Sequence, residues 1–259
     1  MLSTLKVVGI QSNLVWENPE ANRNYFEKEI KKLSSDVDIV ILPEMFTTGF
    51  SMNAGPFAET NEGETYRWLL ATSKSTNKAL IGSIIYTEKD KYYNRLVFVE
   101  PNGEIHHYDK RHTFTLAGEH EVYESGSETI VISYKGWRIC PLICYDLRFP
   151  VWSRNTNDYD LLIYIASWPV MRVKAWDILL KARAIENMSY VIGVNRIGAD
   201  ANNYQYSGHS AIIDFMGEIL SKLEDNEEGK VSAVLDKAKL QSVRKKLGFL
   251  NDRDQFKIL

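Results

Sequence analysis

The chain has 259 residues, of which 44% are hydrophobic, and this is enough to bury a large core. Its formal net charge is −3 with acidic and basic residues interspersed, which argues against the basic patches that bind nucleic acid or anionic membranes. The sequence contains no apolar run long enough to span a bilayer and does not begin with a secretory leader pattern, so we expect a globular protein of the cytoplasm.

Short β-branched runs alternate with amphipathic stretches along the chain. The predicted strands are 6–11, 38–42, 79–86, 95–99, 129–133, 137–143, 161–166, 190–195, 210–214 and 231–235. The predicted helices are 19–33, 65–75, 151–157, 175–187 and 237–246, with Asn18 placed to cap the first. Turn sequences at Pro101, Lys135 and Met216 indicate hairpins.

The order of these elements predicts the fold class. Strand-then-helix units lie at both ends of the chain and hairpins lie in the middle, which is typical of an α/β fold with two mixed sheets. We therefore expect a four-layer α-β-β-α sandwich, in which the sheets pack face to face and the helices lie outside. No linker, low-complexity tract or internal repeat interrupts the sequence, so residues 1–259 are predicted to form a single domain.

The two cysteines, Cys140 and Cys144, differ in their predicted positions. Neighbours along one strand are poorly placed to bridge each other, so both thiols are expected to be free. Cys140 lies inside the strand 137–143, where a free cysteine usually behaves as a small hydrophobe. Cys144 directly follows that strand, and α/β folds place ligands at the carboxyl ends of strands. Cys144 is therefore the candidate nucleophile.

Two charged residues occupy comparable positions. Glu44 follows the nearly all-apolar strand 38–42, and Lys110 follows the expected strand that ends in "HHYD". Taken alone, either residue is most simply a solvated charge or a member of a structural ion pair. Together with Cys144 they form a set of one glutamate, one lysine and one cysteine, each at the junction of a strand and a loop.

Several segments resemble one known family. "LPEMF", "DKRHTF" and "CYDLRFP" are similar to the signature segments of the nitrilase superfamily of carbon–nitrogen hydrolases, whose members use a Glu-Lys-Cys triad. Residues 167–198 and 206–220 are also similar to the segments that follow the cysteine in that family, so the resemblance covers nearly the whole chain. One departure is Ala175-Trp176, where many relatives have His-Trp, so any role of that histidine is missing here.

The resemblance implies a role for each residue of the triad. Cys144 would attack an amide carbonyl and form a thioester, and Glu44 would act as the general base. Lys110 and the backbone N–H of Tyr145 would stabilise the negative charge on the carbonyl oxygen. This chemistry requires no metal and no cofactor.

Family members also carry a second cleft glutamate shortly before a turn glycine. Glu119 lies at the matching distance from Gly126, whereas Glu121 and Glu124 are less well placed. The resemblance implies that Glu119 holds Lys110 in position.

The segment around Cys144 is most similar to the omega-amidase branch, which acts on 2-oxoglutaramate and related ω-monoamides of dicarboxylic acids. Nitrile-cleaving members are a poorer match. Such a substrate carries a carboxylate, for which Arg148 is the first candidate partner and Arg172 the second. The candidate apolar walls are Phe46, Phe114, Tyr145 and Trp168. Relatives commonly form dimers, which implies a homodimer or higher homo-oligomer in which residues 248–256 extend onto a partner subunit.

Other readings of the residues remain open at this point. A different carbon–nitrogen hydrolase specificity, for N-carbamoyl amino acids or aliphatic amides, fits the same triad. A Cys-His hydrolase would use His112, which lies two residues after Lys110. A metal hydrolase is disfavoured because His106 and His107 lack the spacing of metal ligands on one helical face. A binding protein without catalytic activity on the same fold is the remaining alternative.

Overall fold

The computed structural model describes residues 4–258 and contains two six-stranded sheets. The strands of the first sheet are β1 (Thr4–Gln11), β2 (Ile39–Ile41), β3 (Ala79–Glu88), β4 (Lys91–Val99), β5 (Ile105–Asp109) and β14 (Gly229–Asp236). The strands of the second sheet are β6 (Ile132–Tyr134), β7 (Trp137–Ile143), β8 (Leu161–Ala166), β9 (Tyr190–Asn195), β12 (Ala211–Ile213) and β13 (Ile219–Lys222). A separate pair is formed by β10 (Ile197–Ala199) and β11 (Gln205–Ser207).

Both sheets are mixed. Their strand orders are β14-β1-β2-β3-β4-β5 and β13-β12-β9-β8-β7-β6. The central strands β1, β2 and β3 of the first sheet are parallel, as are β7, β8 and β9 of the second. The flanking strands pair antiparallel with their neighbours.

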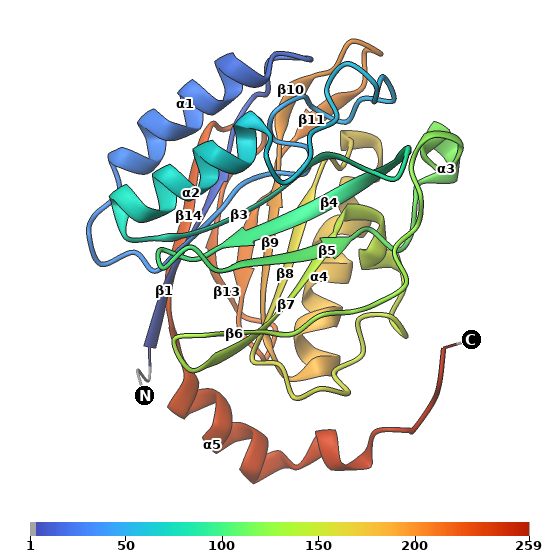
Figure 1. Cartoon of the computed structure of the whole chain (residues 1–259). Helices are drawn as coiled ribbons and strands as arrows, with labels where there is room; N and C mark the ends of the chain where they lie inside the picture. The colour runs from blue at the N-terminus through green and yellow to red at the C-terminus, as the bar shows by residue number, and fades with distance from the viewer. Residues whose placement is uncertain (1–3, 259) are drawn as a thin grey trace.

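The helices cover the outer faces of the two sheets (Figure 1). They are α1 (Pro19–Lys31), α2 (Glu64–Thr76), α3 (Glu119–Val122), α4 (Val173–Asn187) and α5 (Lys237–Leu247). Short 3₁₀ helices are η1 (Thr115–Ala117), η2 (Cys144–Arg148), η3 (Val170–Arg172) and η4 (Phe249–Asp252). Helices α1 and α2 cover the first sheet, α4 covers the second, and α5 lies beyond the ends of the strands. The predicted four-layer α-β-β-α sandwich is confirmed.

Side chains alternate between two cores, as the period of a β-strand requires. Val7 of β1 belongs to the core between the sheets, whereas its neighbour Val8 packs in the core beneath α1 and α2. The two sheets pack closely at Gly9, where an added Cβ would lie only 2.5 Å from the Cγ2 atom of Val194 on β9. Glycine therefore allows β1 and β9 to pack against each other.

Most predicted elements agree with the structure. Strands 137–143, 161–166 and 190–195 match β7, β8 and β9 residue for residue. The Asn18 side chain caps α1 by accepting a hydrogen bond from the backbone N–H of Ala21 at 3.1 Å. Within residues 4–258, no helix has both the length and the apolar character needed to cross a bilayer.

The helix predicted at 151–157 is wrong, because this segment forms turns. The side chain of Asn155 competes with helical hydrogen bonding: its Oδ1 accepts from the backbone N–H of Tyr159 at 2.9 Å, and its Nδ2 donates to the carbonyl of Asn187 at 3.0 Å. Strand β13 and the β10–β11 pair were not among the predicted strands.

Candidate active site

Three elements place the charged candidates at one end of the sandwich. Glu44 lies just after β2 and Lys110 directly follows β5. These strands run in the same direction, since β3 is parallel to β2 and the antiparallel β4 separates β3 from β5. Glu119 begins the short helix α3 in the loop after Lys110.

The three side chains form a buried cluster. The Nζ of Lys110 lies 2.9 Å from Glu44 Oε1, and 2.9 and 2.8 Å from the two carboxylate oxygens of Glu119. Lys110 is 1% exposed and both glutamates are 0% exposed. Burial by itself lowers the pKa of Lys110, but the carboxylates of Glu119 and Glu44 outweigh it and hold that pKa above its usual value. The lysine is therefore cationic.

Cys144 lies beside this cluster. Its side chain and that of Lys110 both line one small space. The backbone N–H of Ser167 donates to Glu44 Oε2 at 2.8 Å and also faces the thiol. Burial raises the pKa of Cys144 well above its usual value, and the charge of Glu44 adds to this rise. Lys110 and the Ser167 N–H oppose it only in part. The thiol therefore carries its proton near neutral pH, and its activation requires a base.

The backbone at Cys144 is strained. Its φ angle is +44°, in the left-handed region that non-glycine residues seldom adopt. The turn is held by the buried carboxylate of Asp146, which accepts hydrogen bonds from the backbone N–H of Ile143 at 3.0 Å and from Tyr108 Oη at 2.7 Å. Strain of this kind persists where the surrounding structure over-determines the conformation.

His112 takes part in the same network. Its backbone N–H lies 3.0 Å and its Nδ1 2.7 Å from Asp146 Oδ1, and its ring stacks on Phe149 with the centroids 3.6 Å apart. The imidazole is thus hydrogen-bonded to Asp146. This arrangement does not support a catalytic pair of Cys144 and His112.

The space at Cys144 adjoins a larger chamber. The inner space has a volume of about 20 Å³ and the outer chamber a volume of about 600 Å³. The two share Phe50, Phe114, Ser167, Pro169 and Arg172 in their walls. Of the predicted apolar walls, Tyr145 and Trp168 line the inner space only and Phe114 lines both.

The two arginine candidates lie on these walls. Arg148 lines the inner space, is exposed, and its guanidinium lies 5.0 Å from the ring centroid of Trp168. Arg172 lines both spaces, is half-buried, and lies 5.0 Å from the centroid of Phe114. Within the described part of the chain, no ion pair with a carboxylate involves either guanidinium.

The prediction that Phe46 forms part of the substrate wall is wrong. Its ring is fully buried beneath α1 and α2, with centroids 5.6 Å from Phe26 and 5.8 Å from Trp68. The turn that follows Glu44 directs this side chain away from the thiol and into the core.

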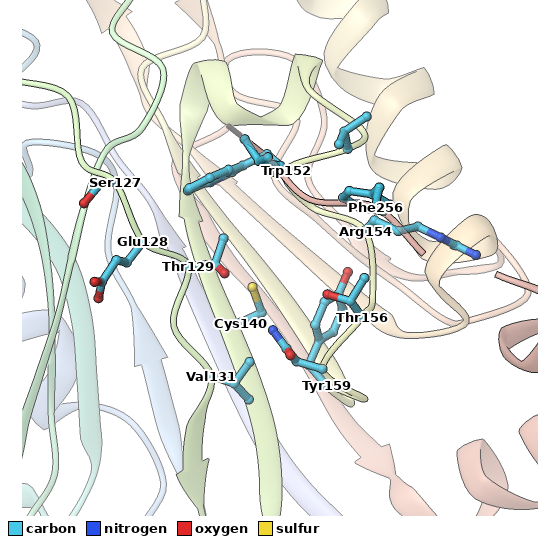
Figure 2. A pocket seen from close by; sticks show the side chains of 13 residues that line it. Ser127, Glu128, Thr129, Val131, Cys140, Trp152, Arg154, Thr156, Tyr159 and Phe256 are labelled. Atoms are coloured by element: carbon cyan, nitrogen blue, oxygen red, sulfur yellow. The ribbon is translucent and has the colours of Figure 1, made fainter. Parts of the chain in front are cut away.

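Cys140 occupies a different environment (Figure 2). It lies at a hollow of about 360 Å³ whose walls include Trp152, Tyr159 and Phe256 but none of the clustered charges. Burial raises the pKa of Cys140 to about 12. Both cysteines are free, as predicted, and Cys140 has the surroundings of an unreactive core residue.

One group among the described residues has the composition and spacing of a metal site, namely Glu100, Glu104 and His106. It lies at the turn between β4 and β5, and none of its members lines the space at Cys144. Metal chemistry at the thiol is not supported by these donors.

Sequence reasoning missed several residues that contact the cluster or the thiol-bearing turn, among them Asn94, Asp146 and Ser167. Asn94 offered a detectable signal, because an amide within the apolar run "YYNRLVF" must find hydrogen-bond partners if that run is a buried strand. Ser167 acts through its backbone N–H, which no sequence pattern reveals.

Comparisons with known proteins identify the family of the chain. The family model described as carbon-nitrogen hydrolase matches residues 5–245. The chain is 45% identical over 258 residues to "Omega-amidase YafV" of Yersinia enterocolitica, covering 100% of both chains. It is 34% identical over 248 residues to "2-oxoglutaramate amidase" of Bacillus subtilis, covering 94% of this chain and 95% of that one.

A solved structure is similar over the full length. XC1258 from Xanthomonas campestris, described as a CN-hydrolase superfamily protein with an arsenic adduct in the active site, superposes with a TM-score of 0.97. It is 38% identical and covers 100% of both chains. The chain therefore belongs to the carbon–nitrogen hydrolase family.

Proposed function

We propose that this protein is an omega-amidase that hydrolyses the terminal amide of small ω-monoamides of dicarboxylic acids, such as 2-oxoglutaramate, to the acid and ammonia. The observation that carries the proposal is the buried cluster of Glu44, Lys110 and Glu119 beside the protonated thiol of Cys144. The full-length similarity to omega-amidases supports the substrate class.

The reaction proceeds through a thioester. Glu44 accepts the thiol proton as Cys144 Sγ attacks the amide carbon, and a tetrahedral intermediate forms. The C–N bond breaks as Glu44 returns that proton to the departing nitrogen, which releases ammonia. Water then attacks the thioester and Glu44 accepts its proton. The C–S bond breaks as Glu44 gives that proton to the sulfur, which regenerates the thiol and releases the acid.

The developing oxyanion is stabilised by two groups. One is the backbone N–H of Tyr145, which follows the nucleophile in η2. The other is the positive charge of Lys110, which acts through its field because Glu44 and Glu119 already accept its hydrogen bonds in the resting site. Glu119 holds the lysine in this place.

The far carboxylate of the substrate binds an arginine. Arg148 is the first candidate and Arg172 the second, and each offers a guanidinium without a carboxylate partner within residues 4–258. A guanidinium binds a carboxylate through two parallel hydrogen bonds, which fixes the amide end of a short substrate near the thiol.

We also propose an assembly and a location, each supported by other features of the chain. The outward face of α4 and η3 exposes Met171, Ile178 and Ile185 at seven-residue spacing, which we propose pairs with the same face of a second copy. The C-terminal segment borders this region, since Phe256 and Glu186 line one groove. The two free thiols suit the reducing cytoplasm.

Ammonia release tests the activity. Wild-type protein is expected to release ammonia from 2-oxoglutaramate and succinamate faster than from N-carbamoyl amino acids, simple aliphatic amides or nitriles. Cys144→Ala and Glu44→Gln are expected to lower kcat by about 10³-fold or more, because each removes a group that acts in the transition state. Cys140→Ala is the matched control and should retain activity.

Arginine variants in the same assay test the substrate class. Replacement of the carboxylate-binding arginine, Arg148→Ala or Arg172→Ala, should raise KM for succinamate at least about tenfold and leave hydrolysis of propionamide unchanged. Undiminished turnover in Cys144→Ala would overturn the nucleophile, whereas preference for an N-carbamoyl compound would overturn only the substrate class.

A further inference from the structure

Asn94 contacts three members of the buried cluster. It lies in β4 and is 1% exposed. Its Nδ2 donates hydrogen bonds to Glu44 Oε1 at 2.8 Å and to Glu119 Oε1 at 3.2 Å, and its backbone carbonyl accepts from the N–H of Lys110 at 3.0 Å. We propose that Asn94 is a positioning residue that sets the arrangement and the proton-accepting role of the two glutamates, an inference that rests on the proposed amide hydrolysis.

The hydrogen bonds of Glu119 leave it no role as a base. A carboxylate has about four acceptor positions. In Glu119 all four accept hydrogen bonds. Both oxygens accept from Lys110, Oε1 also accepts from Asn94, and Oε2 also accepts from the backbone N–H of Phe114. No position remains for a proton from the thiol or from water.

Glu44 keeps one free hydrogen-bond acceptor position, whereas Glu119 keeps none. Its Oε1 accepts from both Lys110 and Asn94, and its Oε2 accepts from the Ser167 N–H. One acceptor position on Oε2 therefore remains, on the oxygen whose N–H partner also faces Cys144. By occupying Oε1, Asn94 directs the basic lone pair of Glu44 toward the nucleophile.

An amide suits this place because it donates without adding charge. With both glutamates ionised, one ammonium leaves the cluster with an excess negative charge. Burial raises the pKa of Glu119, and the charge of Glu44 adds to this rise. The two hydrogens of Nδ2 offset this repulsion by bonding one carboxylate each. An aspartate would add a third carboxylate, and an apolar side chain would leave two acceptor positions buried without donors.

Asn94→Ala and Asn94→Asp test the proposal on whichever amide the wild type hydrolyses. We expect kcat to fall about 10- to 100-fold in Asn94→Ala and further in Asn94→Asp, with KM changed by less than about threefold. We also expect the acid limb of the kcat/KM profile to move to higher pH by about one unit in Asn94→Ala, because the ionised carboxylates lose their donors.

The pH profile separates positioning from general destabilisation. Among the residues that the structure describes, the titratable groups coupled by charge to Glu44 or Glu119 include Lys110, Cys144, Tyr123 and Tyr206, and the substitutions leave these in place.

Asn155→Ala is the matched control. Asn155 is another fully buried asparagine with several side-chain hydrogen bonds, and it touches no member of the cluster. This variant should lower the melting temperature and leave the acid limb in place. If Asn94→Ala fails to fold, the kcat of the nearly isosteric Asn94→Asp is measured in its place.

Three outcomes decide the matter. A wild type that hydrolyses no amide in the panel overturns both the function and this role. An active wild type with full kcat and an unmoved acid limb in the Asn94 variants overturns this role alone. A loss of kcat that scales with the loss of thermal stability in Asn94 and Asn155 variants alike, with no movement of the limb, also overturns it.

Discussion

At the scale of single residues, the two cysteines show how the environment decides reactivity. They are four positions apart along one stretch of chain, yet only Cys144 reaches the space that contains Lys110. Both thiols are buried and both have a raised pKa. In the proposed mechanism, reactivity at Cys144 therefore depends on a base within reach, and not on a thiolate already present in the resting protein.

This difference predicts the pH dependence of alkylation. The pKa of Cys144 lies above the ordinary value of about 8.5, so its rate of reaction with iodoacetamide should still be rising at pH 9. Fragment-ion mass spectrometry must separate Cys144 from Cys140, because cleavage after Arg138 and Arg148 leaves both in one tryptic peptide. A plateau near pH 6 would indicate a stable thiolate–cation pair and contradict the general-base mechanism.

At the scale of elements, the short helix η2 turns the chain sharply after β7 and presents the thiol. Asp146 holds this turn through donors on β7, on β5 and in the following loop, including Tyr108 and His112. A local network of this kind explains how Cys144 keeps a φ angle of +44°.

Asp146→Asn tests this account. The variant replaces one acceptor oxygen with a donor NH₂ group, so buried donors lose their partner. We expect unfolding to become easier by about 3 kcal/mol, which corresponds to a melting temperature lower by roughly 6–12 °C, and kcat to fall. His112→Asn removes the ring's contacts with Asp146 and Phe149 but leaves Asp146 itself in place, so it should keep activity within about tenfold. A larger loss in His112→Asn than in Glu44→Gln would favour a Cys-His pair instead.

At the scale of the whole molecule, the active site exists because two sheets meet. Glu44 and Lys110 follow strands of the first sheet and Cys144 follows a strand of the second. At Gly9, the absence of a side chain lets β1 of the first sheet pack closely against Val194 on β9 of the second. Packing between the layers therefore brings the proposed base, Glu44, and the proposed nucleophile, Cys144, to one place.

The exposed face of α4 predicts the assembly. Ile178 is 67% and Met171 is 70% exposed, and burying them against a second copy would remove both from water. Wild-type protein should elute at twice the mass of one chain in size exclusion with light scattering, and Ile178→Glu should shift it toward the monomer. Val234→Glu, at an exposed apolar residue on β14, is the control. A monomeric wild type would contradict the proposed dimer.

The sequence by itself determined the elements whose signals are local. Continuous apolar runs specified the central strands β7, β8 and β9, and Asn18 specified the start of α1, because strand burial and helix capping depend on neighbouring residues. The resemblance of short motifs also identified Glu44, Lys110, Glu119 and Cys144 as candidates. Where side-chain hydrogen bonds reached distant partners, as at Asn155, local prediction failed.

Only the tertiary structure decided how the candidates meet and which others join them. Phe46 is an aromatic residue near the end of a strand, as expected of a pocket wall, but it lies in the core. Asn94 looks like an ordinary strand residue in the sequence, but its side chain donates hydrogen bonds to two carboxylates. Glu44 and Lys110 are 66 positions apart in the chain and 2.9 Å apart in space. Such contacts depend on the packing of whole layers, because burial and electrostatic fields act through space and not along the sequence.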